Sequence, residues 1–149
     1  MTVGEYCNRD VIIANGAESL RKAAELMREY HVGDLLLVED RDDVRRPVGI
    51  VTDRDLVVEV MATGLDPDAL TLGELVTGAL FLVHEDDSLF DALEMMRGHG
   101  VRRVPVVDAD GALVGIIAVD DVIALLAEIL DDMAALVQRE RDREQDHRP

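Results

Sequence analysis

The residues with the clearest chemical potential are a threonine and an aspartate three positions apart, Thr52 and Asp55, which follow the apolar run 48–51. A hydroxyl and a carboxylate at a helix start can hold vicinal sugar hydroxyls, as an acidic residue does for ribose in dinucleotide-binding folds. The same pair can also serve the fold alone, because acidic side chains stabilise the first turn of a helix. The two residues by themselves leave both interpretations open.

Basic side chains are needed before this corner could hold a phosphate, since its carboxylates repel anions. Arg54 lies within the corner, and Arg102 and Arg103 precede the apolar run 104–107. Charged residues are mostly found on protein surfaces. These arginines can therefore be interpreted either as phosphate ligands or as solvated surface side chains.

A second copy of the corner lies 66 residues later, where Asp121 corresponds to Asp55 and Ala118 corresponds to Thr52. With an offset of 69, residues 2–38 align with residues 71–107 without a gap and share eleven identical pairs. The polar segment 39–46 is three residues longer than its counterpart, which predicts a surface loop there. The chain is therefore a tandem duplication.

Each copy contains the same order of predicted elements: a short helical turn, a strand, an amphipathic helix, two strands in a hairpin and a closing helix. The strands are expected at residues 11–14, 35–38 and 48–52, and at 80–83, 104–107 and 113–118. The helix at 20–30 presents an apolar face that includes Tyr30, and the one at 89–99 presents a face that includes His99. Either the serine or the acidic residue before each helix could cap it.

This β-α-β-β-α order predicts an α/β (α+β) fold with boundaries at residues 2–70 for repeat 1 and 71–130 for repeat 2. A unit of about 60 residues buries little surface alone. We therefore expect the two repeats to pack as a pseudo-twofold pair, with sheets facing, helices outside and clefts between the repeats.

Residues 131–149 are predicted to form an extension of the last helix and a charged tail, solvated from residue 138. From Asp120 onward the apolar residues follow alternating spacings of four and three, which is typical of a coiled-coil seam. The seam packs either on the chain's own surface or against a second subunit, since small modules often form twofold dimers. Its members are Val122, Leu126, Ile129, Met133 and Leu136.

Composition excludes several classes of function. The formal charge of −17 disfavours nucleic acids and anionic membrane surfaces as partners. A single cysteine allows no intrachain disulfide, and no apolar run approaches the ~20 residues of a membrane span. The four histidines are scattered and no catalytic signature occurs, so the sequence predicts a cytoplasmic protein that is not an enzyme.

The corner pattern Gly-h-h-Thr-x-x-Asp at residues 49–55, together with the segment GVRRVPVVD at residues 100–108, resembles the CBS domain (cystathionine-β-synthase motif). The likeness covers about residues 2–130 and includes the tandem arrangement. It implies a Bateman module, a regulatory sensor that binds AMP, ADP, ATP, NAD or S-adenosylmethionine in clefts between the repeats and often forms a homodimer.

The resemblance also implies roles for individual residues. In the family the aspartate of the corner holds ribose hydroxyls, the hydroxyl residue supports ribose or phosphate, and basic residues near the inner strands meet phosphate. Because Ala118 lacks the hydroxyl and the arginines occur only in repeat 2, one composite site is expected, with a weaker one around Asp121. The composite site comprises Thr52, Asp55 and Arg54 with Arg102, Arg103 or both.

Adenine walls are expected at Val11 and Ile12 and at Leu80 and Phe81, positions that suit a hydrophobic core equally well. The resulting hypothesis is a nucleotide-sensing regulatory module that forms a homodimer and acts on a separate downstream protein. The alternative is a dimerisation or scaffold module without a ligand, whose clefts are filled by side chains.

Overall fold

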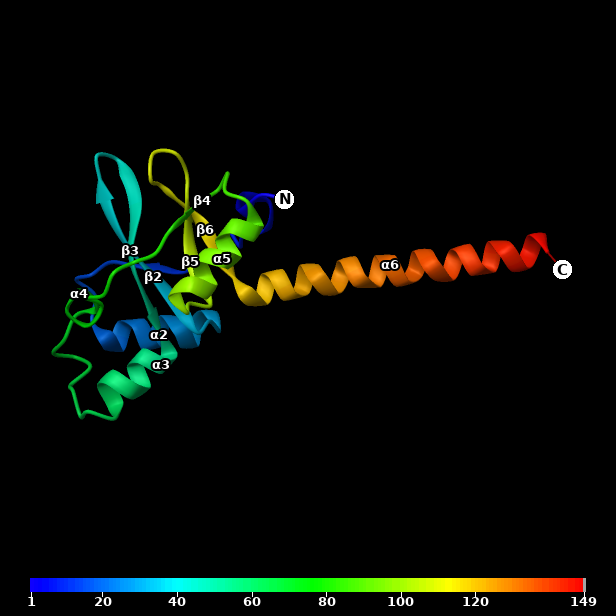
Figure 1. Cartoon of the computed structure of the whole chain (residues 1–149). Helices are drawn as coiled ribbons and strands as arrows, with labels where there is room; N and C mark the ends of the chain where they lie inside the picture. Colours follow the sequence, from blue (N-terminus) through cyan, green and yellow to red (C-terminus); the bar gives the residue numbers. More distant parts are fainter. Residues whose placement is uncertain (149) are drawn as a thin grey trace.

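The computed structural model describes residues 1–148 and contains two similar halves, each built on a three-stranded sheet (Figure 1). In each sheet the first strand runs parallel to the second, and the second pairs antiparallel with the third. The repeated topology and the mixed α+β fold are confirmed. The strands are β1 (Ile13–Ala14), β2 (Asp34–Arg41) and β3 (Val44–Thr52) in one sheet, and β4 (Val83–His84), β5 (Arg103–Val107) and β6 (Leu113–Ala118) in the other.

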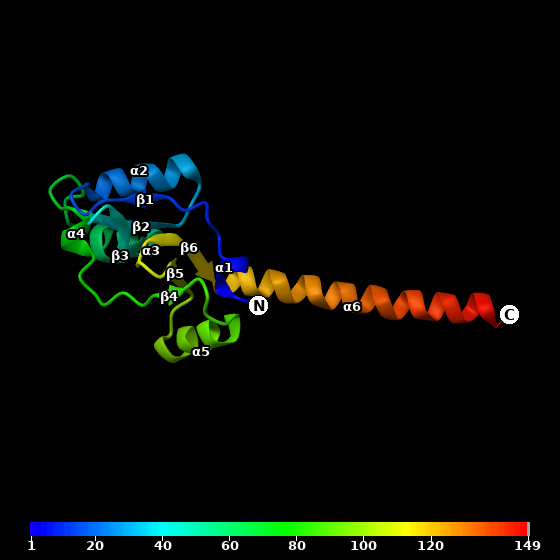
Figure 2. The same cartoon turned by 90° about the horizontal axis from the view of Figure 1, so that it is seen from above.

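The two equivalent helices α2 (Leu20–Tyr30) and α5 (Leu89–His99) lie on opposite sides of the paired sheets, which confirms the pseudo-twofold arrangement (Figure 2). Ser19 caps α2, because its hydroxyl accepts a hydrogen bond from the backbone N–H of Lys22. Ser88 caps α5 in the same way, through the N–H of Phe90. The helical elements are α1 (Val3–Tyr6), α2 (Leu20–Tyr30), α3 (Asp53–Asp55), the π-helical η1 (Leu56–Met61), α4 (Leu72–Leu75), α5 (Leu89–His99) and α6 (Val119–His147).

Each half is completed by the short helix that starts the other repeat in the sequence. Val3 of α1 is fully buried among residues of the second half, and Leu72 of α4 is fully buried among residues of the first. Backbone bridges join Thr2 to Ser88 and Ser19 to Thr71 at these crossings. The two repeats are therefore interlocked, and each hydrophobic core depends on both.

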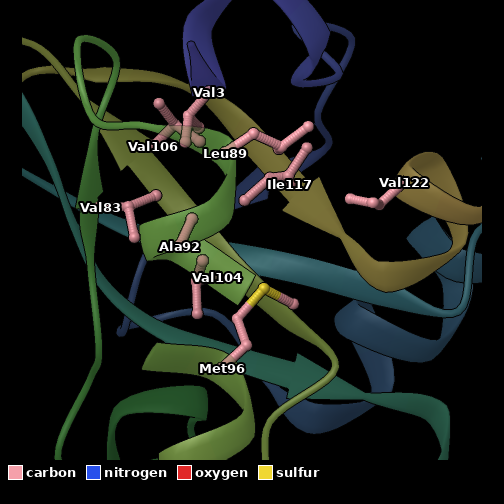
Figure 3. Packing of buried hydrophobic residues seen from close by; sticks show 9 residues of the cluster. All are labelled: Val3, Val83, Leu89, Ala92, Met96, Val104, Val106, Ile117 and Val122. Carbon is pink, nitrogen blue, oxygen red and sulfur yellow. The ribbon is translucent and has the colours of Figure 1, made fainter. Parts of the chain in front are cut away.

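The cores are aliphatic, as the composition predicts. Figure 3 shows one of them, in which residues of β4, β5 and β6 meet one face of α5. Its members are Val3, Val83, Leu89, Ala92, Met96, Val104, Val106, Ile117 and Val122. The equivalent cluster in the first half is Ala14, Leu20, Ala23, Met27, Leu35, Leu37, Val51, Val60 and Leu72.

The prediction of a polar loop at residues 39–46 is wrong. β2 and β3 continue as a hairpin with a two-residue turn at Asp42 and Asp43, whose φ angles are 53° and 61°. A two-residue hairpin turn with both central residues at positive φ matches the twist of its strands, so the ladder can extend through polar residues. Two other local predictions also fail. Tyr30 and His99, expected on the apolar faces of their helices, are exposed. The strand expected at residues 80–83 pairs only from Val83, so residues 80–82 precede β4.

The start of α6, as far as Leu125, packs on the body of the protein, and the rest of the helix extends away from it (Figures 1 and 2). Val122 is 6% exposed, whereas Leu126 is 53% and Met133 is 58% exposed. Packing of the seam on the chain's own surface is therefore wrong beyond the first turn. The residues predicted as a tail remain helical as far as His147, and Pro149 lies outside the described residues.

Candidate functional site

The Thr52–Asp55 corner forms a capping box where β3 ends and α3 begins. The hydroxyl of Thr52 accepts from the backbone N–H of Asp55 at 3.1 Å, and Asp55 Oδ2 accepts from the N–H of Thr52 at 2.9 Å. This reciprocal pair satisfies two backbone donors that a helix start would otherwise leave unpaired. Within residues 1–148 the second carboxylate oxygen of Asp55 accepts no hydrogen bond, so the cap fixes the side chain without using all of it.

The equivalent corner of repeat 2 forms only half of this arrangement. Asp121 Oδ2 accepts from the backbone N–H of Ala118 at 3.0 Å. The methyl group of Ala118 has no acceptor, so the hydroxyl half of the box is absent here. Both aspartates are nevertheless held in the same orientation relative to their strands.

Asp55 lines a cleft of about 330 Å³ between the two repeats, which we call the first cleft. One wall comes from β3 and from the helical elements α3 and η1, which follow it. The opposite wall comes from the segment before β4 and from the start of β5. The lining residues are Gly49, Ile50, Asp55, Glu59, Leu75, Val76, Thr77, Gly78, Ala79, Leu80, Phe81, Val101, Arg103 and Val104.

Asp121 lines a second cleft of about 280 Å³, related to the first by the internal duplication. The first cleft lies at the small end of the roughly 300–1,000 Å³ range typical of ligand pockets and the second lies just below it, which suits a mononucleotide or nucleoside. The residues lining the second cleft are Asn8, Asp10, Val11, Ile12, Val32, Gly33, Asp34, Arg103, Ile116, Ala118, Asp120 and Asp121.

Arg103 lines both clefts, because it lies where the two repeats meet. Its guanidinium forms an ion pair with Asp34, and the two side chains are 32% and 28% exposed. Arg103 and Asp34 are equivalent positions of the two repeats, separated by the repeat offset of 69. Equivalent positions meet where a pseudo-twofold axis passes between them, so the duplication itself creates this contact.

The other two predicted arginines lie outside the clefts. The guanidinium of Arg102 pairs with Asp120 at 3.0 Å, and both side chains are more than 70% exposed. Arg54 is exposed on α3. Of the arginines offered by the sequence, Arg103 alone lines the cleft that Asp55 lines, while Thr52 bonds to Asp55 rather than lining the cleft.

The predicted adenine walls are divided between the two clefts. Leu80 and Phe81 line the first cleft, and Val11 and Ile12 line the second. The ring of Phe81 stacks on the imidazole of His99, with centroids 3.8 Å apart and planes 19° apart. Part of the aromatic surface at the first cleft is therefore already covered by the protein.

The electrostatic character of the two clefts differs. Among the described lining residues of the first cleft, Asp55 and Glu59 stand against Arg103. The second cleft is lined by the same arginine and by four carboxylates, Asp10, Asp34, Asp120 and Asp121, of which Asp34 pairs with Arg103 and Asp120 pairs with Arg102. An anionic ligand meets much less repulsion in the first cleft than in the second.

Several lining features were not identified from the sequence, among them Glu59, Asp34 and the segment 77–79. The first two carry charge into the clefts, and the segment supplies backbone to the wall of the first cleft. Asp34 could have been found, because the offset of 69 makes it the counterpart of Arg103. The segment 77–79 has no comparable signal in the sequence.

The single cysteine, Cys7, lines neither cleft. Burial raises the pKa of the Cys7 thiol above its ordinary value of 9.0. Within the part of the chain that the structure describes, no cluster of three or more potential metal ligands occurs. None of the helices described between residues 1 and 148 is long and apolar enough to cross a membrane.

Comparison with known proteins identifies the two repeats. The family model described as the CBS domain matches residues 3–62 and again residues 72–128. Hypoxic response protein 1 of Mycobacterium tuberculosis is 37% identical over 127 residues, which cover 85% of this chain and 86% of that protein. A crystal structure of Hypoxic Response Protein I, with two coordinated zinc ions, superposes with a TM-score of 0.71 and covers 83% of this chain and 98% of the other.

Two further structural neighbours were solved with adenosine derivatives bound. A CBS domain protein from Pyrobaculum aerophilum, complexed with AMP, is 28% identical, with a TM-score of 0.73 over 88% of this chain and 99% of the other. The CBS domain pair of protein MJ0100, complexed with 5′-methylthioadenosine and S-adenosyl-L-methionine, is 25% identical, with a TM-score of 0.71 over 85% of this chain and 99% of the other. With its duplicated β-α-β-β-α units and both repeats matched, the chain belongs to the CBS domain family.

Proposed function

We propose that this protein is a regulatory module that binds an adenosine mononucleotide in the first cleft. The observation that carries the proposal is the convergence of Asp55 from one repeat and Arg103 from the other on one cleft of about 330 Å³. The family membership and the relatives solved with AMP and with S-adenosyl-L-methionine support it.

Each residue has a distinct role in this proposal. Asp55, held by its bonds to Thr52, offers its second carboxylate oxygen to the ribose hydroxyls. Arg103 neutralises the phosphate, and Leu80 with Phe81 forms an apolar surface for the base. Because Arg103 is the one cation among the described lining residues, AMP suits the cleft better than the more highly charged ATP.

A second candidate ligand class is favoured by the charge of the second cleft. Even with Asp120 paired to Arg102 and Asp34 paired to Arg103, the carboxylates of Asp10 and Asp121 remain in the lining, and they favour a neutral or cationic adenosine derivative, such as one carrying a sulfonium group. S-Adenosylmethionine has this character. We therefore assign phosphorylated ligands to the first cleft and uncharged or cationic ones to the second.

The proposal is tested by isothermal titration calorimetry with AMP, ATP, NAD and S-adenosylmethionine. Asp55→Asn is the informative variant. The amide oxygen can still accept a hydrogen bond from the Thr52 N–H, which preserves this half of the cap. The amide NH2 then faces the ribose hydroxyls, and it donates hydrogen bonds where the carboxylate oxygen accepts them. A charged hydrogen bond contributes about 1.5–3 kcal/mol, so AMP affinity should fall by roughly ten- to hundredfold.

Asp121→Asn is the matched control, because Asp121 makes the same backbone contact at the other corner. It should leave AMP affinity unchanged. Equal weakening by both variants would overturn the assignment of AMP to the first cleft. Absence of any binding or thermal shift with all four compounds would instead favour a dimerisation or scaffold module without a ligand.

The proposed role is regulatory and not catalytic, and its output passes to a separate protein. Binding across the repeats would hold Asp55 and Arg103 together and so reduce the relative motion of the two halves. A downstream partner that recognises the joined surface of the halves would respond to this change.

A further inference from the structure

The exposed part of α6 carries an unbroken apolar stripe. Seven large apolar side chains within fifteen residues are between 36% and 68% exposed. Consecutive members are three residues or one residue apart, in the repeating order three, three, one, so all of them fall on one side of the helix. We call this set the α6 stripe, and its members are Ile123, Leu126, Ile129, Leu130, Met133, Leu136 and Val137.

The stripe is not covered by the protein's own body. α6 leaves the body after Leu125 and extends away from it in two perpendicular views (Figures 1 and 2). Contiguous apolar patches of several hundred Å² are rare on monomers and mark interaction sites. A helix of this kind also depends on tertiary packing for most of its stability.

Charge along α6 indicates what covers the stripe. The first half of the helix carries five acidic residues and no basic one, namely Asp120, Asp121, Glu128, Asp131 and Asp132. The final segment, residues 138–148, carries four arginines and four carboxylates, so its formal charge is zero; these are Arg139, Arg141, Arg143 and Arg148, and Glu140, Asp142, Glu144 and Asp146. A second copy running antiparallel brings the arginines of each helix beside the acidic half of the other, whereas a parallel copy places the two acidic halves together.

We propose that α6 forms an antiparallel two-helix interface with a second copy of this chain. Pairing Ile129 with the second copy's Met133, and Leu126 with its Leu136, covers the stripe along its whole length. The twofold axis then passes near residue 131, in the middle of the stripe. Asp132 meets its own copy at the exposed edge of the stripe, where water and salt screen the repulsion.

The body of the protein favours the same orientation. Residues 1–118 contain 11 basic and 23 acidic residues, so each body carries a net charge of −12. Antiparallel helices hold the two bodies at opposite ends of the interface, where their mutual repulsion is smallest. The final segment of each helix, whose formal charge is zero, then lies beside the acidic first turn of its partner.

Sedimentation velocity of the full chain tests the interface, with Met133→Glu as the disrupting variant. Met133 is 58% exposed, so a charge at this position leaves the fold of the isolated chain intact, which circular dichroism verifies. Ala135→Glu is the matched control, since it adds the same charge two residues away, at an exposed position on the side of the helix opposite the stripe. We expect a wild-type dimer, a dimer for Ala135→Glu and at least a hundredfold weaker association for Met133→Glu.

The orientation is measured with a spin label on Gln145→Cys in a Cys7→Ser background. With 1.5 Å per residue, the two labels lie about 42 Å apart along antiparallel helices and roughly 20 Å apart across parallel ones. A monomeric wild type, or a dimer unaffected by Met133→Glu, overturns the interface. A short label distance overturns the antiparallel arrangement.

Discussion

The ion pair between Arg103 and Asp34 should couple the two repeats energetically. Each side chain comes from a different sheet, and the pair lies at the junction of the two clefts. The perturbations are Arg103→Gln and Asp34→Asn, alone and together. Both replacements keep the approximate side-chain volume and remove one charge, so a double-mutant cycle isolates the interaction between the two residues.

The magnitude follows from the exposure of the pair. Fully exposed pairs contribute about 0–1 kcal/mol, whereas removing one partner of a fully buried pair costs about 3–5 kcal/mol. With roughly a third of each side chain exposed, we expect a coupling of about 1–2 kcal/mol. Arg103→Gln should be the costlier single change, because it leaves the carboxylates of both clefts without the arginine, whereas the arginine freed by Asp34→Asn can turn toward Asp55 or Glu59.

Urea denaturation of the four proteins gives the coupling, with the m-value checked for a constant denatured state. In thermal melts a loss of 1–2 kcal/mol corresponds to about 2–8 °C for a chain of this size. A coupling below about 0.3 kcal/mol would show that the two residues act independently. A larger cost for Asp34→Asn than for Arg103→Gln would refute the electrostatic reasoning about the clefts.

Three further predictions concern single positions. Gly115→Ala should destabilise the protein by about 1–3 kcal/mol in the same urea assay, because the added Cβ would lie 2.4 Å from the backbone oxygen of Asn8. Gly98→Ala is its counterpart on α5, where the added methyl group meets open space, and it should stabilise the protein by about 0.5–1 kcal/mol. Ala118→Thr should raise the melting temperature, since the added hydroxyl completes the second capping box, and an unchanged or lower value would count against the role of that box. Because burial raises the pKa of the Cys7 thiol, the unfolded thiol ionises before the folded one as the pH rises. The stability that this thiol contributes is therefore present at neutral pH and lost at alkaline pH, and Cys7→Ser should remove that loss.

Features set by local sequence were predictable. The duplication is visible as identical pairs at a fixed offset, and the Thr52–Asp55 capping box follows from two residues three positions apart. The serine caps and the aliphatic cores also depend on neighbouring residues and on periodicity. The extended hairpin at residues 39–46 was missed because its polar composition resembles a loop, while two aspartates at positive φ allow a tight turn.

Which arginine reaches a cleft was decided only by the tertiary structure. Arg102 and Arg103 are adjacent, so in an extended strand their side chains point to opposite faces. Their types and spacing are alike, and the packing of one sheet against the other determines which face turns inward. That packing brings Arg103 to Asp34 and leaves Arg102 on the surface with Asp120.

The last helix shows the same division. The sequence by itself determined that residues 122–137 form a helix with one apolar side, because that pattern depends only on spacing along the chain. Whether the body covers that side depends on where the helix leaves the second sheet and in which direction it points. In the structure α6 points away from the body. Its direction could not be predicted, because a contact between distant segments is fixed by the packing of the whole fold and not by the residues of either segment.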